Sequence, residues 1–312
     1  MVTSELVAVI DCGTNTTRLL ITDGSGVDIR VQKITGLGRG VGASRRLTED
    51  GIKRVSDTLC EFRELIEHHK VQSVRAVGTS AVRDALNQDA FIDAASEALN
   101  AKVEIISGEF EAKYSFLGAT ADLDPSNGPY LVVDIGGGST EFAYGTNEPL
   151  AWRSVDMGAV RYTEQYLGSD PPRPEELGAA IQVARLHLDD IDREQPQIGR
   201  ASQLIGVAGT VTSIAAVELG LQDYKREMVD KFLLKRSAAE DVFRTLATES
   251  LEDRLHNPGL DPKRAGVIVG GCCILVAVMR HWEIDECLVR ERDLLDGLAD
   301  EMLDANQASE DG

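Results

Sequence analysis

The chain has 312 residues, of which 43% are hydrophobic and 27% charged, and its formal net charge is −20. This composition is typical of a globular protein, and the length suits two domains better than a single core. The acidic charge argues against nonspecific binding of nucleic acid through a basic face. No apolar run reaches the roughly 18 residues of a membrane span, and no signal peptide is evident. The five cysteines form no disulfide pattern. We therefore expect a cytoplasmic protein that binds neither nucleic acid nor membranes.

An internal repeat begins near the first residues of the chain. Residues 7–18 read as an apolar strand that ends in Asp11, followed by a Gly/Thr turn and a second strand. They align without a gap with residues 130–141, whose strand ends in Asp134. Two further matches follow in the same order, pairing 31–39 with 152–160 and 74–80 with 204–210. Three matches at similar spacing indicate a duplication.

The repeat predicts a fold of the α/β class. Each half opens with a β-hairpin, and we expect the two hairpin turns to face each other across a cleft. This is the arrangement of duplicated actin-like (ribonuclease H-like) domains, which also occurs in sugar kinases.

Other elements follow from local patterns. Apolar residues at helical spacing predict a helix over 49–70. Helices are also expected over 87–100 and 109–120, on either side of a short strand at 102–106. The alternation of helices and strands supports the α/β assignment.

A turn-rich segment marks the predicted domain boundary. The turn-rich segment 121–129 divides the chain into an N-terminal domain over 1–124 and a C-terminal domain over 125–312. The apolar run 265–279 is read as a buried helix. The acidic stretch 296–312, which has no Lys or Arg, is expected to end in disorder and to repel polyanions, with a last helix packing back on the first domain.

The two turns are candidates for phosphate binding. Consecutive N–H groups in a glycine turn form an anion site, and glycine lets a phosphate approach the backbone. Ordinary hairpin turns are the alternative, but the facing pair favours phosphate. Hydroxyl and N–H groups around Ser80 offer a third anion site at a helix start, where Arg83 is either a phosphate ligand or a surface residue. The predicted phosphate-binding turn residues are Gly13, Thr14, Asn15, Thr16, Gly136, Gly137, Gly138 and Ser139.

Carboxylates beside the two turns predict a metal site. Asp134 and Glu141 flank the second turn, and Asp11 holds the equivalent place before the first. Carboxylates beside bound phosphates usually hold Mg²⁺, which bridges to phosphoryl oxygens. The alternative is a set of solvated hairpin charges. We expect Mg²⁺ as the cofactor, with Mn²⁺ able to replace it.

Five sequence motifs resemble those of the exopolyphosphatase / guanosine pentaphosphate phosphohydrolase family over nearly the whole chain. They are DCGTNTTRLL at 11–20, TSAVRDALN at 79–87, ISGEFEAK at 106–113, DIGGGSTE at 134–141 and MGAVR at 157–161. The resemblance implies that Glu111 is the general base and that Asp134 and Glu141 help hold magnesium. It also implies that Arg83, Gly209 and Thr210 contact phosphates together with the two turns.

Four positions depart from the family pattern. Phe110 and Lys113 replace a glutamate and an arginine beside Glu111, which is itself retained. Arg290 stands where a serine is usual and Leu295 where many members carry arginine. These last two departures concern the far end of the substrate site.

The resemblance implies hydrolysis of the terminal phosphate of inorganic polyphosphate by in-line attack of water, and we expect the protein to form a homodimer. Guanosine pentaphosphate or another nucleotide is the alternative substrate. An ATP-dependent small-molecule kinase and a non-catalytic actin-like binding protein are the alternatives of other classes, since fold alone does not separate them. A basic cluster is interpreted either as part of a polyanion path or as a solvated helix face; its members are Arg39, Arg45, Arg46, Lys53 and Arg54.

Overall fold

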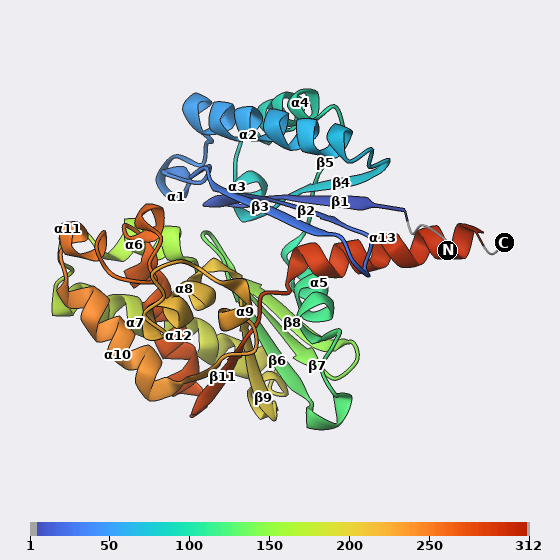
Figure 1. The fold of residues 1–312 in the computed structure, drawn as a ribbon. Helices are drawn as coiled ribbons and strands as arrows, with labels where there is room; N and C mark the ends of the chain where they lie inside the picture. The colour runs from blue at the N-terminus through green and yellow to red at the C-terminus, as the bar shows by residue number, and fades with distance from the viewer. Residues whose placement is uncertain (1–4, 311–312) are drawn as a thin grey trace.

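Two β-sheets organise residues 5–310, the part of the chain that the computed structural model describes (Figure 1). The first sheet has the strand order β3-β2-β1-β4-β5. Strand β1 pairs antiparallel with β2 and parallel with β4. The strand bounds are β1 Val7–Cys12, β2 Thr16–Thr22, β3 Asp28–Ile34, β4 Ser73–Gly78 and β5 Val103–Ile105.

The second sheet repeats this order with one added strand, as β8-β7-β6-β9-β11-β10. Its strands are β6 Tyr130–Ile135, β7 Thr140–Gly145, β8 Pro149–Val155, β9 Gln203–Val207, β10 Leu233–Lys235 and β11 Glu286–Val289. The three aligned segments of the sequence fall on the equivalent strand pairs β1/β6, β3/β8 and β4/β9. The predicted duplication and the actin-like fold are therefore confirmed.

Helices α2 Glu49–His68 and α4 Gln88–Leu99 cover the first sheet on the side away from the second lobe (Figure 1). The short helices α1 Val41–Ser44 and α3 Ser80–Arg83 lie next to the second lobe, where Val41 and Ser80 share a small cavity with Val160. Helix α2 begins where the Thr48 side chain accepts a hydrogen bond from Gly51 N, and it buries Val55, Leu59 and Phe62. The helices predicted over 49–70 and 87–100 are confirmed.

The second lobe carries most of the remaining helices. They are α6 Ala159–Tyr166, α7 Pro174–Glu194, α8 Ala208–Glu218, α9 Arg226–Val229, α10 Arg236–Thr248, α11 Leu251–Arg254 and α12 Ile268–His281, with 3-10 turns η1 Pro125–Asn127, η2 Ile198–Arg200 and η3 Pro262–Arg264. Helix α12 is the predicted buried helix, since its residues from Ile268 to Met279 are all buried.

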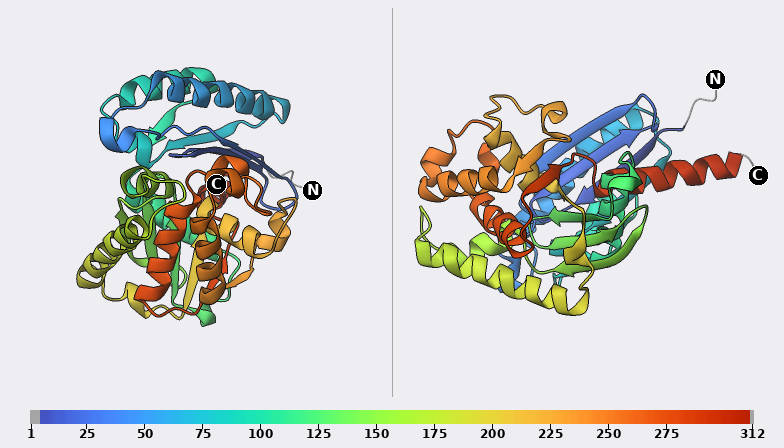
Figure 2. Two further views of the ribbon diagram at one scale, coloured as in Figure 1. Left: turned by 90° about the vertical axis from the view of Figure 1, so that its left-hand side faces the viewer. Right: turned by 90° about the horizontal axis from the view of Figure 1, so that it is seen from below.

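Two helices join the lobes. Helix α5 Gly108–Thr120 packs on β6, β7 and β8, and α13 Leu294–Glu310 packs on α5 and on β1 and β2 of the first sheet (Figure 2). Their crossing is so close that a Cβ atom on Gly118 would lie 2.0 Å from the Asp293 carbonyl oxygen. A Cβ atom on Gly297 would lie 2.2 Å from the carbonyl oxygen of Tyr114.

The expectation that the acidic stretch ends in disorder was wrong for residues 296–310. Helix α13 extends to Glu310 because it buries an apolar stripe that includes Leu298 and Leu303 against the first sheet. Its carboxylates are also engaged, with Asp300 2.7 Å from Arg292 and Glu301 2.6 Å from Arg75. Only 311–312 of this stretch lie outside the described residues.

Two further expectations concern the cell compartment. No helix within residues 5–310 combines the length and the apolar character needed to cross a lipid bilayer. All five cysteines are free thiols, and four of them are buried: Cys12, Cys272, Cys273 and Cys287.

Candidate active site

The two hairpin turns meet between the lobes. Each turn, 13–16 and 136–139, is closed by a backbone hydrogen bond of 3.0 Å between its first and last residues. A Cβ atom on Gly138 would lie 2.6 Å from Ser80 Oγ and 2.7 Å from Thr14 Oγ1. Glycine is therefore required at this position by the close approach of the opposite lobe.

A cavity of about 80 Å³ lies at this meeting point, and we call it the turn cavity. It brings together most of the residues that the sequence predicted for the site. They are Asp11, Gly13, Thr14, Asn15, Thr16, Ser80, Glu111, Asp134, Gly136, Gly137, Gly138, Ser139, Gly209 and Thr210. Contributions from both lobes thus converge on one small volume.

Backbone donors are available around the turn cavity. Among the described residues, no acceptor is assigned to the N–H groups of Asn15, Gly137 and Gly138. The N-terminus of helix α8 adds Gly209 and the buried Thr210 to the wall. The first residue of this helix, Ala208, has a φ of 65°, which is unusual for a residue with a side chain. Exposed N–H groups and a helix N-terminus favour a bound anion.

Of four buried carboxylates in this region, three line the turn cavity, and the fourth, Glu141, lies opposite Asp134 in the β6–β7 pairing. Oδ2 of Asp11 accepts hydrogen bonds from Arg18, and Oδ2 of Asp134 accepts one from Ser115 Oγ at 2.6 Å. The other two are Glu111 and Glu141, and all four are at most 8% exposed. Such a density of acidic groups in a buried site costs free energy unless a cation or protons offset it.

Glu141 and Arg83 are the two predicted site residues that do not line the turn cavity. Glu141 Oε1 accepts a hydrogen bond of 2.7 Å from Ser154 Oγ on β8. Arg83 Nη1 donates to the Ile106 carbonyl oxygen at 2.8 Å and to Glu111 Oε2 at 3.2 Å. Arg83 thus contacts the predicted base rather than the cavity.

Burial shifts the pKa values of these carboxyl groups upward. Burial, with Asp134 beside it, raises the pKa of Glu141 to about 8. The pKa of Asp134 is raised to about 6, mainly by burial and secondly by the negative charge of Asp293. The pKa of Glu111 lies well above its usual value because of burial and of Glu141, and Arg83 opposes that shift. Each raised pKa means that the buried carboxylate has too little positive charge beside it to offset its loss of solvation.

The carboxylates fit a hard cation bound together with substrate. Asp11 Oδ1 and Glu141 Oε2 are buried oxygens without a hydrogen-bond partner. In residues 5–310 no three acidic, His or Cys side chains form a preassembled metal cage. Mg²⁺ keeps several waters and commonly uses one or two carboxylates plus phosphate oxygens, so it needs no such cage.

Two arginines of the turn cavity were missed by the sequence reasoning. Arg18 donates to Asp11 Oδ2 from Nε at 3.1 Å and from Nη2 at 2.8 Å, and Asp293 accepts from its Nη1. The position of Arg18 inside the first motif was a usable signal. The guanidinium of Arg264 makes no hydrogen bond or ion pair with any described residue, and it packs on Gly209. No sequence pattern singled it out.

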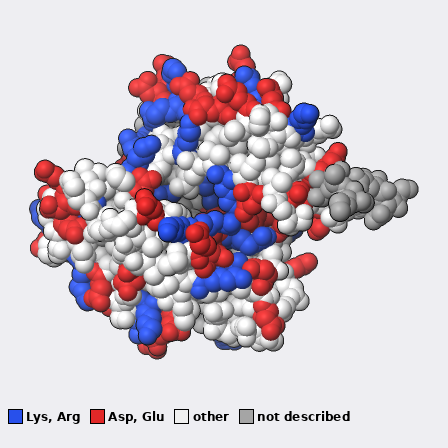
Figure 3. All heavy atoms as spheres, in the orientation of Figure 1, with Lys and Arg blue, Asp and Glu red and all other residues white. Residues whose placement is uncertain are grey.

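A larger cavity of about 570 Å³ adjoins the turn cavity and shares Arg18, Gln32, Gly209 and Arg264 with it. We call it the arginine cavity, because its lining includes Arg18, Arg30, Arg226, Arg264 and Arg290. In Figure 3, Lys and Arg side chains gather in the middle of the molecule, where the two lobes meet.

Arg290, one of the departures from the family pattern, has a structural role at the wall of the arginine cavity. Its fully buried side chain donates to Asp230 at 3.0 Å, to Asp122 at 2.7 Å and to the Ala119 carbonyl oxygen at 2.8 Å. All these partners are protein groups, so Arg290 ties α5 and its following turn to the second lobe.

The predicted basic cluster does not line either cavity. Lys53 pairs with Asp57 at 2.7 Å on the surface of α2. Arg54 donates from Nε to the Thr35 carbonyl oxygen at 2.7 Å. For these two residues the interpretation as a helix face is the better one.

The fold is that of an actin-like protein, and its cleft combines two facing glycine turns, several arginines and buried carboxylates, a set of groups suited to phosphoryl chemistry. The sequence profile of the Ppx/GppA phosphatase family matches residues 27–306, and the chain belongs to this family. It is 36% identical over 310 residues to "Exopolyphosphatase 2" of Mycobacterium tuberculosis, covering 94% of this chain and 97% of the relative.

Two further comparisons give the same family. The crystal structure of an exopolyphosphatase-like protein matches with a TM-score of 0.93 at 33% identity, covering 96% of this chain and 99% of that one. A guanosine-5'-triphosphate,3'-diphosphate pyrophosphatase from Photobacterium profundum is 30% identical over 96% of this chain. The present chain spans only 60% of that longer relative.

Proposed function

We propose that the protein is an exopolyphosphatase that hydrolyses the terminal phosphoanhydride of inorganic polyphosphate and releases orthophosphate. The observation that carries this proposal is that Glu111, a buried carboxylate, lines the turn cavity together with residues of both glycine turns. A carboxylate in that place can accept a proton from water that attacks a bound phosphoryl group.

Substrate binding would use groups from both lobes. N–H groups of the two turns and the N-terminus of α8 would hold the terminal phosphoryl group, with Ser80 and Thr210 as hydroxyl donors. Arg264, which has no ion-pair partner in the described chain, would bind a phosphate oxygen. Fixed donors that meet the charge developing on the phosphoryl oxygens lower the barrier.

Glu111 would act as the general base. It needs positive charge beside it to be ionised at neutral pH, because burial raises its pKa. Arg83 supplies such a charge at 3.2 Å and also fixes the side-chain orientation. Arg83 is thus proposed to position the base, in place of the phosphate contact inferred from the sequence.

Asp134, Glu141 and Asp11 are the residues that would hold Mg²⁺, or Mn²⁺ in its place. The bound cation would neutralise phosphoryl charge, as divalent metals do in phosphoryl transfer. The unpartnered oxygens of Asp11 and Glu141 support this assignment.

Guanosine pentaphosphate is a second candidate substrate. The relative from Photobacterium profundum and the size of the arginine cavity favour it. The wall of that cavity combines the Tyr224 ring with Leu221 and Leu260, surfaces on which a nucleoside could pack. A small-molecule kinase would need a second substrate whose hydroxyl meets Glu111, and a binding protein would release no phosphate.

Phosphate release tests the proposal directly. The purified protein with Mg²⁺ should release phosphate from polyphosphate, and the same assay should be run with guanosine pentaphosphate and ATP. Release from guanosine pentaphosphate alone would favour the second candidate. Release from none of the three would contradict a hydrolase function. Cytoplasmic location and homodimer formation remain predictions, and sedimentation of the purified chain would measure the second.

A further inference from the structure

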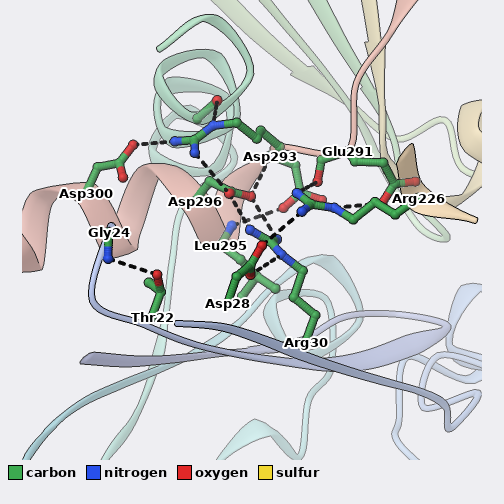
Figure 4. Close-up of polar contacts among 12 residues, drawn as sticks. Thr22, Gly24, Asp28, Arg30, Arg226, Glu291, Asp293, Leu295, Asp296 and Asp300 are labelled. Carbon is green, nitrogen blue, oxygen red and sulfur yellow. Dashed lines mark hydrogen bonds and ion pairs between the residues drawn. The ribbon is translucent and has the colours of Figure 1, made fainter. Parts of the chain in front are cut away.

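A network of ion pairs borders the arginine cavity (Figure 4). Arg30, on β3 of the first lobe, directs Nε to Asp28 Oδ1 at 2.7 Å and its other nitrogens to Asp296 at 3.1 and 2.6 Å. Arg226, on α9 of the second lobe, directs Nη1 to Asp28 Oδ2 at 3.0 Å. The two oxygens of Asp28 therefore hold two arginines that come from opposite lobes.

Both arginines line the arginine cavity, whereas Asp28 does not. Asp28 instead borders a smaller cavity beside the 22–28 hairpin loop, which Arg30 also lines. Asp28 engages Nε of Arg30 and Nη1 of Arg226, two arginines that border the volume adjoining the turn cavity, while Asp296 holds the other nitrogens of Arg30. An anion in that volume would compete with Asp28 for the same N–H donors.

These contacts are of the kind that a phosphate can displace. The side chains of Asp28, Arg30 and Arg226 are 45%, 25% and 34% exposed, and ion pairs at such sites contribute little to stability. Arg226 Nε is buried without a hydrogen-bond acceptor, at 3.6 Å from Glu291 Oε2. Arg226 therefore has hydrogen-bonding capacity that its present partners do not use.

We propose that Asp28 is a specificity-determining residue that competes with the substrate for Arg30 and Arg226 and so disfavours long polyphosphate chains. This inference rests on the proposed function. The reacting end of every substrate occupies the turn cavity. Only a substrate long enough to continue through the arginine cavity meets the two arginines, and it must take them from Asp28.

The test compares tripolyphosphate with a long polyphosphate in Asp28→Asn. The variant keeps the shape of Asp28 but removes the charge that holds the arginines. We expect the KM for long polyphosphate to fall about two- to fivefold, the range that exposed ion pairs support. The KM for tripolyphosphate and the kcat for both substrates should stay unchanged.

Asp57→Asn is the matched control. Asp57 is also an exposed aspartate in an ion pair, 2.7 Å from Lys53, and its removal changes the net charge by the same amount. A general effect of the acidic field on a polyanion would lower the KM equally in both variants and for both substrates. That outcome would overturn the proposal.

Arg226→Gln separates competition from a mechanical role. If the Asp28–Arg226 pair only held the lobes together, Asp28→Asn and Arg226→Gln would both break it and would shift the KM for long polyphosphate in the same direction. Competition requires opposite directions, with a lower KM for long polyphosphate in Asp28→Asn and a higher one in Arg226→Gln. Shifts of the same sign would contradict the inference. The absence of phosphate release from wild-type protein would instead refute the proposed function.

Discussion

Arg83 Nη1 lies 3.2 Å from Glu111 Oε2 and 2.8 Å from the carbonyl oxygen of Ile106, so one guanidinium links the predicted base to the end of the preceding strand segment. This relationship ties a residue of the first lobe to the chemistry of the cleft. It also makes the ionisation of Glu111 dependent on Arg83. The first two predictions concern this pair.

Glu111→Gln should reduce turnover about 10²–10⁴-fold, because the amide cannot accept the water proton. Substrate KM should change little, since the glutamine keeps the size and polarity of the side chain. Steady-state phosphate release measures both constants. Glu109→Gln is the control and should retain wild-type rates, because Glu109 lies two residues before Glu111 on α5 and is exposed.

Arg83→Ala should shift the acidic limb of the pH–rate profile upward. Arg83 lowers the pKa of Glu111, so its removal raises that pKa, and a higher pH is then needed to ionise the base. The pH dependence of kcat/KM measures this shift. If Arg83→Ala loses activity but keeps the same pH–rate profile, Arg83 does not act through the pKa of Glu111.

Asp134→Asn should raise the Mg²⁺ concentration needed for half-maximal activity by at least about tenfold, since even outer-shell changes commonly have effects of that size. Ser154→Ala should have a smaller effect in the same direction, because Ser154 orients Glu141 through a 2.7 Å hydrogen bond. Calorimetric titration with Mg²⁺ measures binding independently of turnover. Full activity of wild-type protein after EDTA treatment would contradict the metal assignment.

Mg²⁺ affinity should increase with pH between about 6 and 8. The pKa of Asp134 is raised to about 6 and that of Glu141 to about 8, so protons occupy these oxygens at the acidic end of this range. Protons and metal compete for the same carboxylates, and loss of the protons favours the metal. Titration calorimetry at three pH values measures the trend. A pH-independent affinity would mean that neither carboxylate binds the ion.

Gly118→Ala should destabilise the fold by about 1–3 kcal/mol or more, because the new Cβ atom would lie 2.0 Å from the Asp293 carbonyl oxygen on α13. Gly178→Ala is the matched control on an exposed stretch of α7, where nothing lies within 4 Å of the new atom. It should stabilise by about 0.5–1 kcal/mol, as expected for Gly→Ala in a helix. Urea denaturation measures both, and equal effects would contradict the close packing of α5 and α13.

Local patterns were sufficient for much of the fold and of the candidate site. The gapless match of 7–18 with 130–141 predicted two hairpins in equivalent positions, since strands that end in Asp and turn at glycine are recognisable without any tertiary contact. The helical spacing of Val55, Leu59 and Phe62 predicted α2 in the same way. Most phosphate-site residues could be predicted because they belong to the turns themselves.

Other features depend on contacts between distant segments, and only the tertiary structure decided them. The sequence predicted a disordered end for helix α13 because residues 296–312 contain no Lys or Arg. Two of the ion-pair partners of this helix, Arg30 and Arg75, come from the first sheet, more than 200 positions away. Arg264 belongs to the site because folding places it against Gly209. Arg83 of α3 meets Glu111 of α5 only in the folded chain, and their separation of 28 residues gives no signal of this contact in the sequence.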